Sequence, residues 1–134
     1  MNYLLDTNIV IFFFKSRYNI DVKLEAAGIE NCFISEITLA ELKYGAYFSQ
    51  NPQKHTNEVD TLLDYVAVLP ITSAIDFYAQ EKARLRKAGL LIDDFDLLIG
   101  CTAIANDLIL VTNNTKHFSR LEGIKLEDWT EQGK

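Results

Sequence analysis

Hydrophobic and polar positions along the chain form two kinds of pattern. Short runs of consecutive apolar residues indicate buried strands, and longer stretches with apolar residues three and four positions apart indicate helices. The predicted strands cover residues 2–6, 32–35, 66–71, 108–112 and 124–126. The predicted helices cover residues 7–15, 20–28, 37–48, 57–65, 93–106 and a long run that Thr72 or Ser73 caps and that ends near Ala88. We expect Asn51-Pro52 to separate two helices, and Pro70 to lie at a strand end or edge, because proline lacks a backbone N–H.

Strands that alternate with helices favour a mainly parallel sheet with helices on both faces. We therefore predict an α/β fold, a three-layer α/β/α sandwich formed by a single domain over residues 1–134. The chain is 49% hydrophobic, which is enough to build a core without disulfides or metals. No apolar run approaches the roughly 20 residues that span a bilayer, and the first residues lack a basic leader region. We expect a cytoplasmic protein with no membrane partner.

The formal net charge is −6, and the sequence pI is about 4.8. Non-specific binding to nucleic acid needs a cationic surface, so this charge argues against a protein that coats DNA. It does not exclude a nuclease, which can gather acids around cations. Cys32 and Cys101 lie inside apolar segments without CxxC spacing. We interpret them as reduced core thiols rather than as a metal site or a disulfide.

The first predicted strand ends in Asp6, and a helical run follows at once. In open α/β sheets, ligands bind at the carboxyl ends of the strands, so Asp6 is a candidate ligand. An Asp before an apolar helix is also a common N-cap, and this residue alone does not separate the two roles.

A second acid occupies a position that disfavours charge. At helical spacing, Glu41 shares a stripe with Ile37, Tyr44 and Phe48. This stripe predicts a carboxylate near the interior, which needs a partner or a cation because an isolated buried charge is costly. The alternative is a capping box in which Thr38 caps the helix and Glu41 caps back.

A third acid, Asp96, lies in the first turn of a very apolar predicted helix, after Asp93 and Asp94. Acids in a first turn suit the helix dipole, and Asp93 is the expected N-cap. Asp96 shares a helical face with Gly100 and Ala103, whose small side chains let another backbone or a ligand approach. We therefore favour a role for Asp96 beyond dipole compensation.

Polar residues also follow the strand 108–112, at the edge where Asp6 is expected. Thr112 and Asn114 offer oxygens that can hold a water or a hydrated cation, although an Asn-rich turn needs no function. Three carboxylates at one edge would raise one another's pKa unless a cation neutralised them. Mg²⁺ takes one or two carboxylates together with waters and phosphate oxygens. The pattern therefore predicts metal-assisted phosphodiester hydrolysis.

Several cations are candidates for contact with a phosphate backbone. Lys43 follows Glu41 by two residues and could reach a phosphate from the rim of the site. Arg84 and Arg86 belong to a basic segment, residues 82–87, which would equally suit a solvated helix end. Recognition of a structured RNA by shape needs only a few such contacts.

Two other features have simple interpretations. The isolated His55 and His117 lie in polar loops, and we interpret them as surface or structural residues. Three consecutive rings, Phe12-Phe13-Phe14, cannot share one helix stripe. We expect at least one of them to face solvent or a partner, unless they build a second core layer.

The chain resembles the PIN-domain ribonucleases, and within them the VapC-type toxins of bacterial and archaeal toxin–antitoxin pairs. In this order and spacing the motifs are highly specific, although each alone is weak. They are Leu4-Leu5-Asp6-Thr7-Asn8, the run from Ile37 to Gly45, Asp96-Leu97-Leu98-Ile99-Gly100, the run from Leu110 to Asn114 with Phe118, and Leu126-Glu127-Asp128-Trp129.

The resemblance implies a Mg²⁺- or Mn²⁺-dependent endoribonuclease that hydrolyses tRNA or another structured RNA. It places metal ligands at Asp6, Glu41 and Asp96, with Thr112 and Asn114 in support. We expect the substrate contacts at Asn8, Lys43, Arg84 and Arg86. The resemblance also implies two protein partners: a second copy of the chain, and an antitoxin whose C-terminal segment lies across the active-site groove and inhibits it.

One departure from the pattern leaves alternatives open. Many relatives have a fourth acid where this chain has Thr112, Asn113 and Asn114, which puts a second metal in doubt. A catalytically weak or inactive PIN-fold binding module is therefore one alternative. A phosphoacceptor receiver domain is another, but it would want paired acids after the first strand, where this chain has Asp6 alone.

Overall fold

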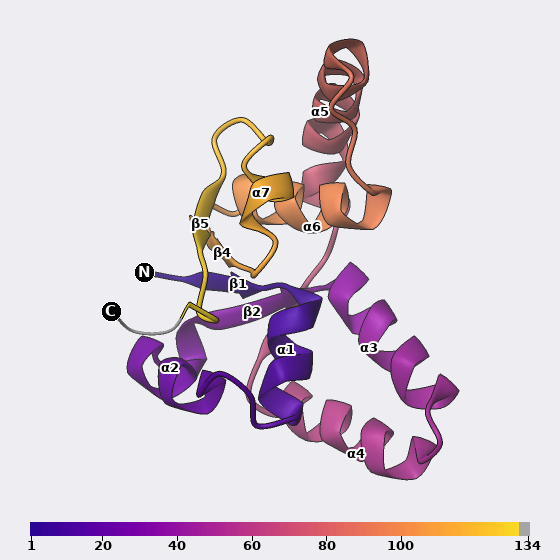
Figure 1. Cartoon of the computed structure of the whole chain (residues 1–134), viewed down its shortest axis with the longest axis vertical. Coiled ribbons are helices and arrows are strands. Elements are labelled where there is room, and N and C mark those ends of the chain that lie inside the picture. Colours follow the sequence, from indigo (N-terminus) through magenta and orange to yellow (C-terminus); the bar gives the residue numbers. More distant parts are fainter. Residues whose placement is uncertain (132–134) are drawn as a thin grey trace.

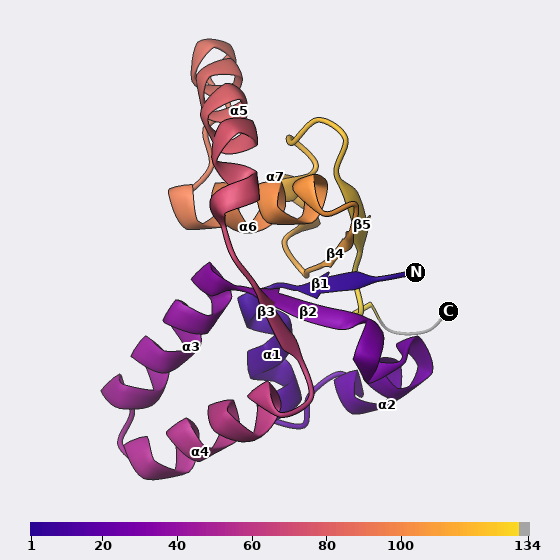
Figure 2. The same cartoon turned by 180° about the vertical axis from the view of Figure 1, so that it is seen from behind.

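The computed structural model describes residues 1–131, in which one sheet of parallel strands lies between two layers of helices (Figure 1, Figure 2). The strands are β1 (Tyr3–Leu5), β2 (Cys32–Ser35), β3 (Ala67–Leu69), β4 (Ile109–Val111) and β5 (Lys125–Glu127). The helices are α1 (Thr7–Phe14), α2 (Ile20–Ala27), α3 (Glu36–Phe48), α4 (Pro52–Leu63), α5 (Ile75–Ala88), α6 (Asp94–Ala105) and α7 (Thr115–Phe118). The strand order is β3-β2-β1-β4-β5, and every pairing is parallel. The predicted α/β/α sandwich is confirmed.

Strand alternation divides the core into two halves. Leu5 and Val111 point to the layer of α1 to α4, whereas Leu4 and Leu110 point to the layer of α5, α6 and α7. All four side chains are almost fully buried. Successive residues of a strand face opposite sides of a sheet, so a strand buried on both sides is apolar throughout, as these strands are.

The parallel pairing brings the carboxyl ends of the strands to one edge. Leu5 pairs with Val111, and the pairing continues because the backbone N–H of Asp6 donates to the carbonyl of Val111 (2.9 Å). The edge therefore places Asp6, Thr112 and Ser35, the residue that ends β2 and caps α3, next to the start of α1 and α3.

Several predicted boundaries were wrong. The helix expected at 57–65 begins five residues earlier, because Pro52 occupies its first turn and the side chain of Asn51 caps it. Proline is tolerated there, where its missing N–H has no helical partner to lose. Residues 72–74 form a 3-10 turn instead of a capped helix start. The short helix α7 was missed, since four residues carry too little periodicity.

The aromatic run on α1 is also different from the expectation. Phe12, Phe13 and Phe14 are all partly buried, and all three pack against the core on the α1 to α4 side. Phe12 contacts Tyr18 edge-to-face, with ring centroids 4.9 Å apart. The second-layer alternative therefore describes these rings better than exposure does.

Small residues on α6 allow close packing, as predicted, but the neighbour is not a ligand. A Cβ built on Gly100 would lie 2.3 Å from Leu121 Cδ1 and 3.2 Å from a Phe118 ring carbon. The segment after β4 therefore lies directly on α6. Cys32 and Cys101 are free and buried, as predicted. Among residues 1–131, no helix has the length and apolarity needed to cross a bilayer.

Candidate active site

Asp6 is a buried carboxylate at the centre of the sheet edge, with 5% of its surface exposed. The backbone N–H of Thr7 donates to its Oδ1 (2.8 Å), and the Thr112 hydroxyl donates to its Oδ2 (2.8 Å). Burial raises the pKa of Asp6, the two hydrogen bonds oppose that rise, and the nearby Glu41 adds to it. Asp6 is also the N-cap of α1, so the cap and the candidate site residue are one side chain.

Glu41 is half-buried on the first turns of α3. The Thr7 hydroxyl donates to its Oε1 at 2.6 Å, the short distance typical of a bond to an ionised carboxylate. The predicted apolar stripe around Glu41 is wrong, because Tyr44 and Phe48 on that stripe are 68% and 79% exposed. The capping-box alternative is also wrong, since Ser35 caps the helix by accepting from the Thr38 N–H.

Asp96 lies in the first turn of α6 and is half-buried. Burial is the largest cause that raises its pKa to about 6, and the charges of Asp6, Asp93 and Glu41 contribute further. The carboxylates predicted as metal ligands therefore lie within electrostatic reach of one another, although they come from the N-cap of α1, from α3 and from α6.

The other two acids at the start of α6 have different roles. Asp93 is the N-cap and accepts from the Phe95 N–H (3.1 Å), as predicted. Asp94 turns toward α5, where Tyr78 and Lys82 donate to the same oxygen, Oδ1, both at 2.9 Å. These donors lower the pKa of Asp94. Asp94 is thus occupied and does not replace a missing fourth acid.

The loop after β4 supports Asp6 in an indirect way. The Asn114 backbone N–H donates to the Thr112 hydroxyl (2.9 Å), which donates in turn to Asp6. Asn114 therefore takes part through its backbone, whereas the sequence suggested its side-chain oxygen. Thr112 is fully buried, so its hydroxyl orients Asp6 and is shielded from solvent.

The predicted substrate contacts are only partly free to act. Asn8 and Arg86 are exposed. Lys43 is also exposed, and it lines a small cavity of about 50 Å³ against α4 that does not include Glu41. The guanidinium of Arg84 makes a two-bond contact with buried Glu81 (2.8 Å each) and donates to the Arg120 carbonyl. Arg84 therefore fastens α5 to the segment after α7.

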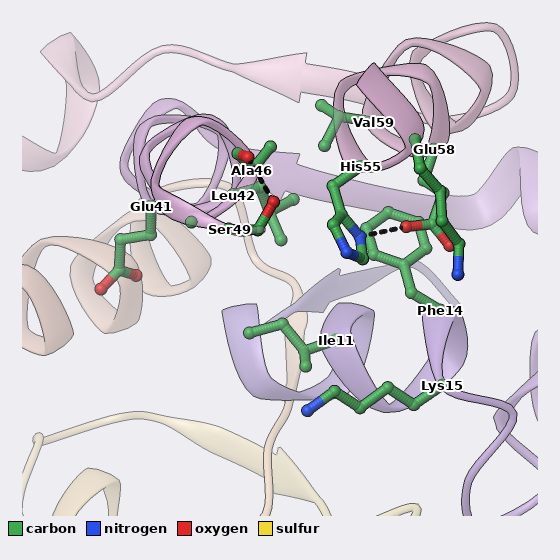
Figure 3. Close-up of a pocket in the computed structure, with 12 residues that line it drawn as sticks. Ile11, Phe14, Lys15, Glu41, Leu42, Ala46, Ser49, His55, Glu58 and Val59 are labelled. Carbon is green, nitrogen blue, oxygen red and sulfur yellow. Dashed lines mark hydrogen bonds and ion pairs between the residues drawn. The ribbon is translucent and has the colours of Figure 1, made fainter. Parts of the chain in front are cut away.

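A cavity of about 530 Å³ leads to Glu41 between α1, α3 and α4. Glu41 lies at one end of it, and a His55–Glu58 pair joined at 2.7 Å lies at the other (Figure 3). Ile11 and Phe14 supply its apolar wall on α1, and Lys15 crosses beneath.

The donor set fits a hard divalent cation. Its ligands would be carboxylate oxygens, and burial together with the neighbouring carboxylates raises the pKa values of Asp6 and Asp96, a setting that a bound cation would relieve. Within residues 1–131, no three or more His, Cys, Asp or Glu side chains already form a group that could hold an ion. Mg²⁺ completes its coordination shell with water and phosphate oxygens beside its carboxylate ligands, so a full protein cage is not required.

Two site residues were missed by the sequence reasoning. Thr7 touches both Asp6 and Glu41, and Thr38 contacts the Thr7 hydroxyl at 3.0 Å. Their positions in the sequence could have indicated them, because Thr7 directly follows the acid at the strand end and Thr38 precedes Glu41 by three residues on one helix.

Comparison with known proteins gives a consistent family. The family model described as the PIN domain matches residues 3–124. The "Ribonuclease VapC2" of Rickettsia felis is 37% identical, over 96% of this chain and 98% of that protein. The "tRNA(fMet)-specific endonuclease VapC" of Shigella flexneri is 34% identical, over 97% and 99%.

Solved structures agree with the sequence comparisons. VapBC2 from Rickettsia felis, bound to a DNA fragment from the promoter, superposes with a TM-score of 0.89 at 34% identity, over 96% of this chain and 99% of that chain. A toxin–antitoxin complex from Klebsiella pneumoniae gives 0.68 at 30% identity, over 92% and 95%. The receiver-domain alternative is therefore wrong. The chain belongs to the PIN-domain family, and the predicted resemblance is confirmed.

Proposed function

We propose that this chain is a metal-dependent endoribonuclease, the toxin of a toxin–antitoxin pair. The observation that carries the proposal is the arrangement of Asp6, Glu41 and Asp96 at the carboxyl edge of the sheet, close enough for each charge to act on the others. Relatives named as VapC ribonucleases match nearly the whole chain, which supports the same activity here.

The proposed metal is Mg²⁺, with Mn²⁺ as an alternative, held by Asp6, Glu41 and Asp96. When bound, such a cation lowers the pKa of a coordinated water and neutralises charge on the scissile phosphate. Thr112 fixes Asp6 through Oδ2, and Thr7 fixes both Asp6 and Glu41. These hydrogen bonds hold the carboxylates in place before substrate arrives, so little reorganisation is needed during the reaction.

The proposed substrate is tRNA or another structured RNA, which places the protein in the cytoplasm. The similarity to a relative named as a tRNA(fMet)-specific endonuclease supports this class. With a net charge of −6, the chain depends on few cationic contacts. Arg86 is exposed near the Tyr78–Lys82–Asp94 cluster and is the candidate cation that best fits this role.

The proposed protein partner is an antitoxin, as the solved toxin–antitoxin complexes suggest. Its inhibitory segment would occupy the cavity between α1, α3 and α4, because that cavity is partly apolar and ends at Glu41. A cationic side chain at that end would pair with the carboxylates and replace the charge of the metal. We also propose a second copy of the chain as a partner, since Ile75, Phe77 and Phe95 leave apolar surface exposed on α5 and α6.

The proposal is tested with antitoxin-free protein and total cellular RNA in the presence of Mg²⁺ or Mn²⁺. The expected result is cleavage that EDTA stops. Asp6→Asn should reduce cleavage by at least about 100-fold, because a proposed ligand should matter more than its hydrogen-bond partners, whose loss costs about 10- to 100-fold. Folding of the variant is checked by circular dichroism. Equal RNA patterns with wild-type protein and Asp6→Asn would contradict the proposal and favour an inactive binding module.

A further inference from the structure

Thr38 is a buried polar residue that the proposed chemistry does not use. It lies in the first turn of α3, and none of its surface is exposed. Its hydroxyl points across to α1, where Thr7 Oγ1 lies 3.0 Å away. Its backbone is fixed separately, because its N–H donates to the Ser35 hydroxyl at the start of the helix.

The direction of the hydrogen bonds follows from counting protons. The Thr7 hydroxyl lies 2.6 Å from Glu41 Oε1 and 3.0 Å from the Thr38 hydroxyl. An ionised carboxylate only accepts, and a hydroxyl has a single proton to donate. Thr7 therefore donates to Glu41, and Thr38 must donate to Thr7. The result is a chain of two hydroxyls that runs from Thr38 to the carboxylate.

The same chain sets the spacing between two acids. Thr7 holds Asp6 through its backbone N–H and Glu41 through its hydroxyl. The Thr7 hydroxyl can rotate about its side-chain bond, and the contact with Thr38 is a second restraint on that rotation beside the bond to Glu41. Thr7 takes one acceptor position of Oε1, which leaves the second oxygen of Glu41 better placed to bind a cation or a water.

We propose that Thr38 is a positioning residue for the metal site, which it orders through Thr7 and Glu41 without touching metal or substrate. This inference rests on the proposed function. Hydrogen-bond partners of ligating side chains commonly change metal affinity by about 10- to 100-fold when they are lost. Removal of the Thr38 hydroxyl should therefore weaken metal binding and raise the metal concentration needed for half-maximal cleavage.

The variant Thr38→Val removes the hydroxyl and keeps the shape of the side chain. Thr38→Ser keeps the hydroxyl and should restore binding. The matched control is Thr102→Val, because Thr102 is equally buried but donates to the Leu98 carbonyl within α6. It loses a buried threonine hydroxyl that has no link to Glu41.

The experiment measures Mn²⁺ binding to the antitoxin-free chain by calorimetry, together with the Mn²⁺ concentration for half-maximal RNA cleavage. We expect Thr38→Val to weaken Mn²⁺ binding by about 10-fold, the lower end of the range for direct partners of a ligand, because Thr38 acts on Glu41 through Thr7. Thr38→Ser and Thr102→Val should bind close to the wild type. Binding to Thr38→Val within twofold of the wild type would overturn the inference, and so would an equal loss in Thr102→Val.

Two further arms keep the outcome clear. If Thr38→Val does not fold, Thr38→Ala is compared with Thr38→Ser, since a smaller side chain leaves a cavity without forcing neighbours apart. A wild-type chain that neither binds Mn²⁺ nor cleaves RNA would refute the proposed function itself. A wild-type chain that does both, beside an unaffected Thr38→Val, would refute only the role of Thr38.

Discussion

At the scale of single residues, the site combines stabilising and destabilising features. Asp6 caps α1 and also brings a charge into a buried position, where hydrogen bonds from Thr7 and Thr112 partly offset the cost. Asp96 receives less help and stays close to other carboxylates. The metal-free protein therefore carries an electrostatic cost at neutral pH that a bound cation would remove.

This cost gives a prediction for Asp96→Asn. The pKa of Asp96 is raised from 3.8 to about 6 in the folded chain. The stability that its protonated form contributes is thus fully present below about pH 4 and is lost as the pH rises through 6. In EDTA, Asp96→Asn should melt at a higher temperature than the wild type at pH 7.5, and the difference should vanish near pH 4.

Thermal unfolding by circular dichroism across this pH range measures the effect. Addition of Mn²⁺ at pH 7.5 should then stabilise the wild type more than Asp96→Asn, since the variant has lost a candidate ligand. A variant that is less stable than the wild type at pH 7.5 in EDTA would contradict the assigned charge repulsion.

At the scale of elements, helix starts and close helix contacts decide where the acids lie. Ser35 ends β2 and caps α3, which fixes Glu41 on the second turn, beside α1. On α6, Gly100 lets Leu121 and Phe118 pack against the helix that carries Asp96. The position of the site therefore depends on the packing of its helices against neighbouring segments as well as on the hydrogen bonds between site residues.

Two glycine substitutions test this packing. Gly100→Ala should destabilise the protein by about 1–3 kcal/mol, because its methyl group would overlap buried Leu121. Gly45→Ala on α3 meets nothing within 4 Å and should stabilise by about 0.5–1 kcal/mol through helix propensity. Urea unfolding of both variants gives the comparison. Equal effects of the two substitutions would show that contact at Gly100 does not limit packing.

At the scale of the whole molecule, the C-terminal segment joins parts that are distant in sequence. After β5, Trp129 is 6% exposed and packs against Tyr3 of β1, with ring centroids 5.5 Å apart. Its carbonyl accepts from the Lys23 ammonium on α2 at 2.6 Å. The last described turn therefore closes the α1 to α4 half of the core.

Trp129→Ala should accordingly lower the free energy of unfolding by about 3–5 kcal/mol, as is usual when a buried aromatic side chain is lost. Tyr65→Ala is the control, since Tyr65 is 63% exposed and its loss should change stability by about 0.5 kcal/mol or less. Equilibrium unfolding in urea measures both. A similar cost for the two variants would mean that Trp129 does not close the core.

The sequence by itself determined the order of strands and helices, the parallel sheet and the candidate acids. These follow from local signals: short continuous apolar runs for the strands, a period near 3.6 for the helices, and charges at positions where burial is costly. It also separated Asp93, the helix cap, from Asp96. The sequence did not reveal the start of α4 or the existence of α7, because a proline in a first turn and a single-turn helix have weak local signals.

Only the tertiary structure decided which side chains meet. Glu81 lies one turn before Arg84 on the same helix, but the Arg120 carbonyl that also accepts from the Arg84 guanidinium comes from the segment after α7. Thr38 and Thr7 are 31 residues apart in sequence, and their hydroxyls meet because the strands before α1 and α3 pair in parallel. Hydrogen bonds between separate elements depend on packing distances and side-chain directions that no local pattern encodes. Asp6 could be proposed as a ligand from the sequence, whereas the hydroxyls that hold its neighbour Glu41 could be identified only from the folded structure.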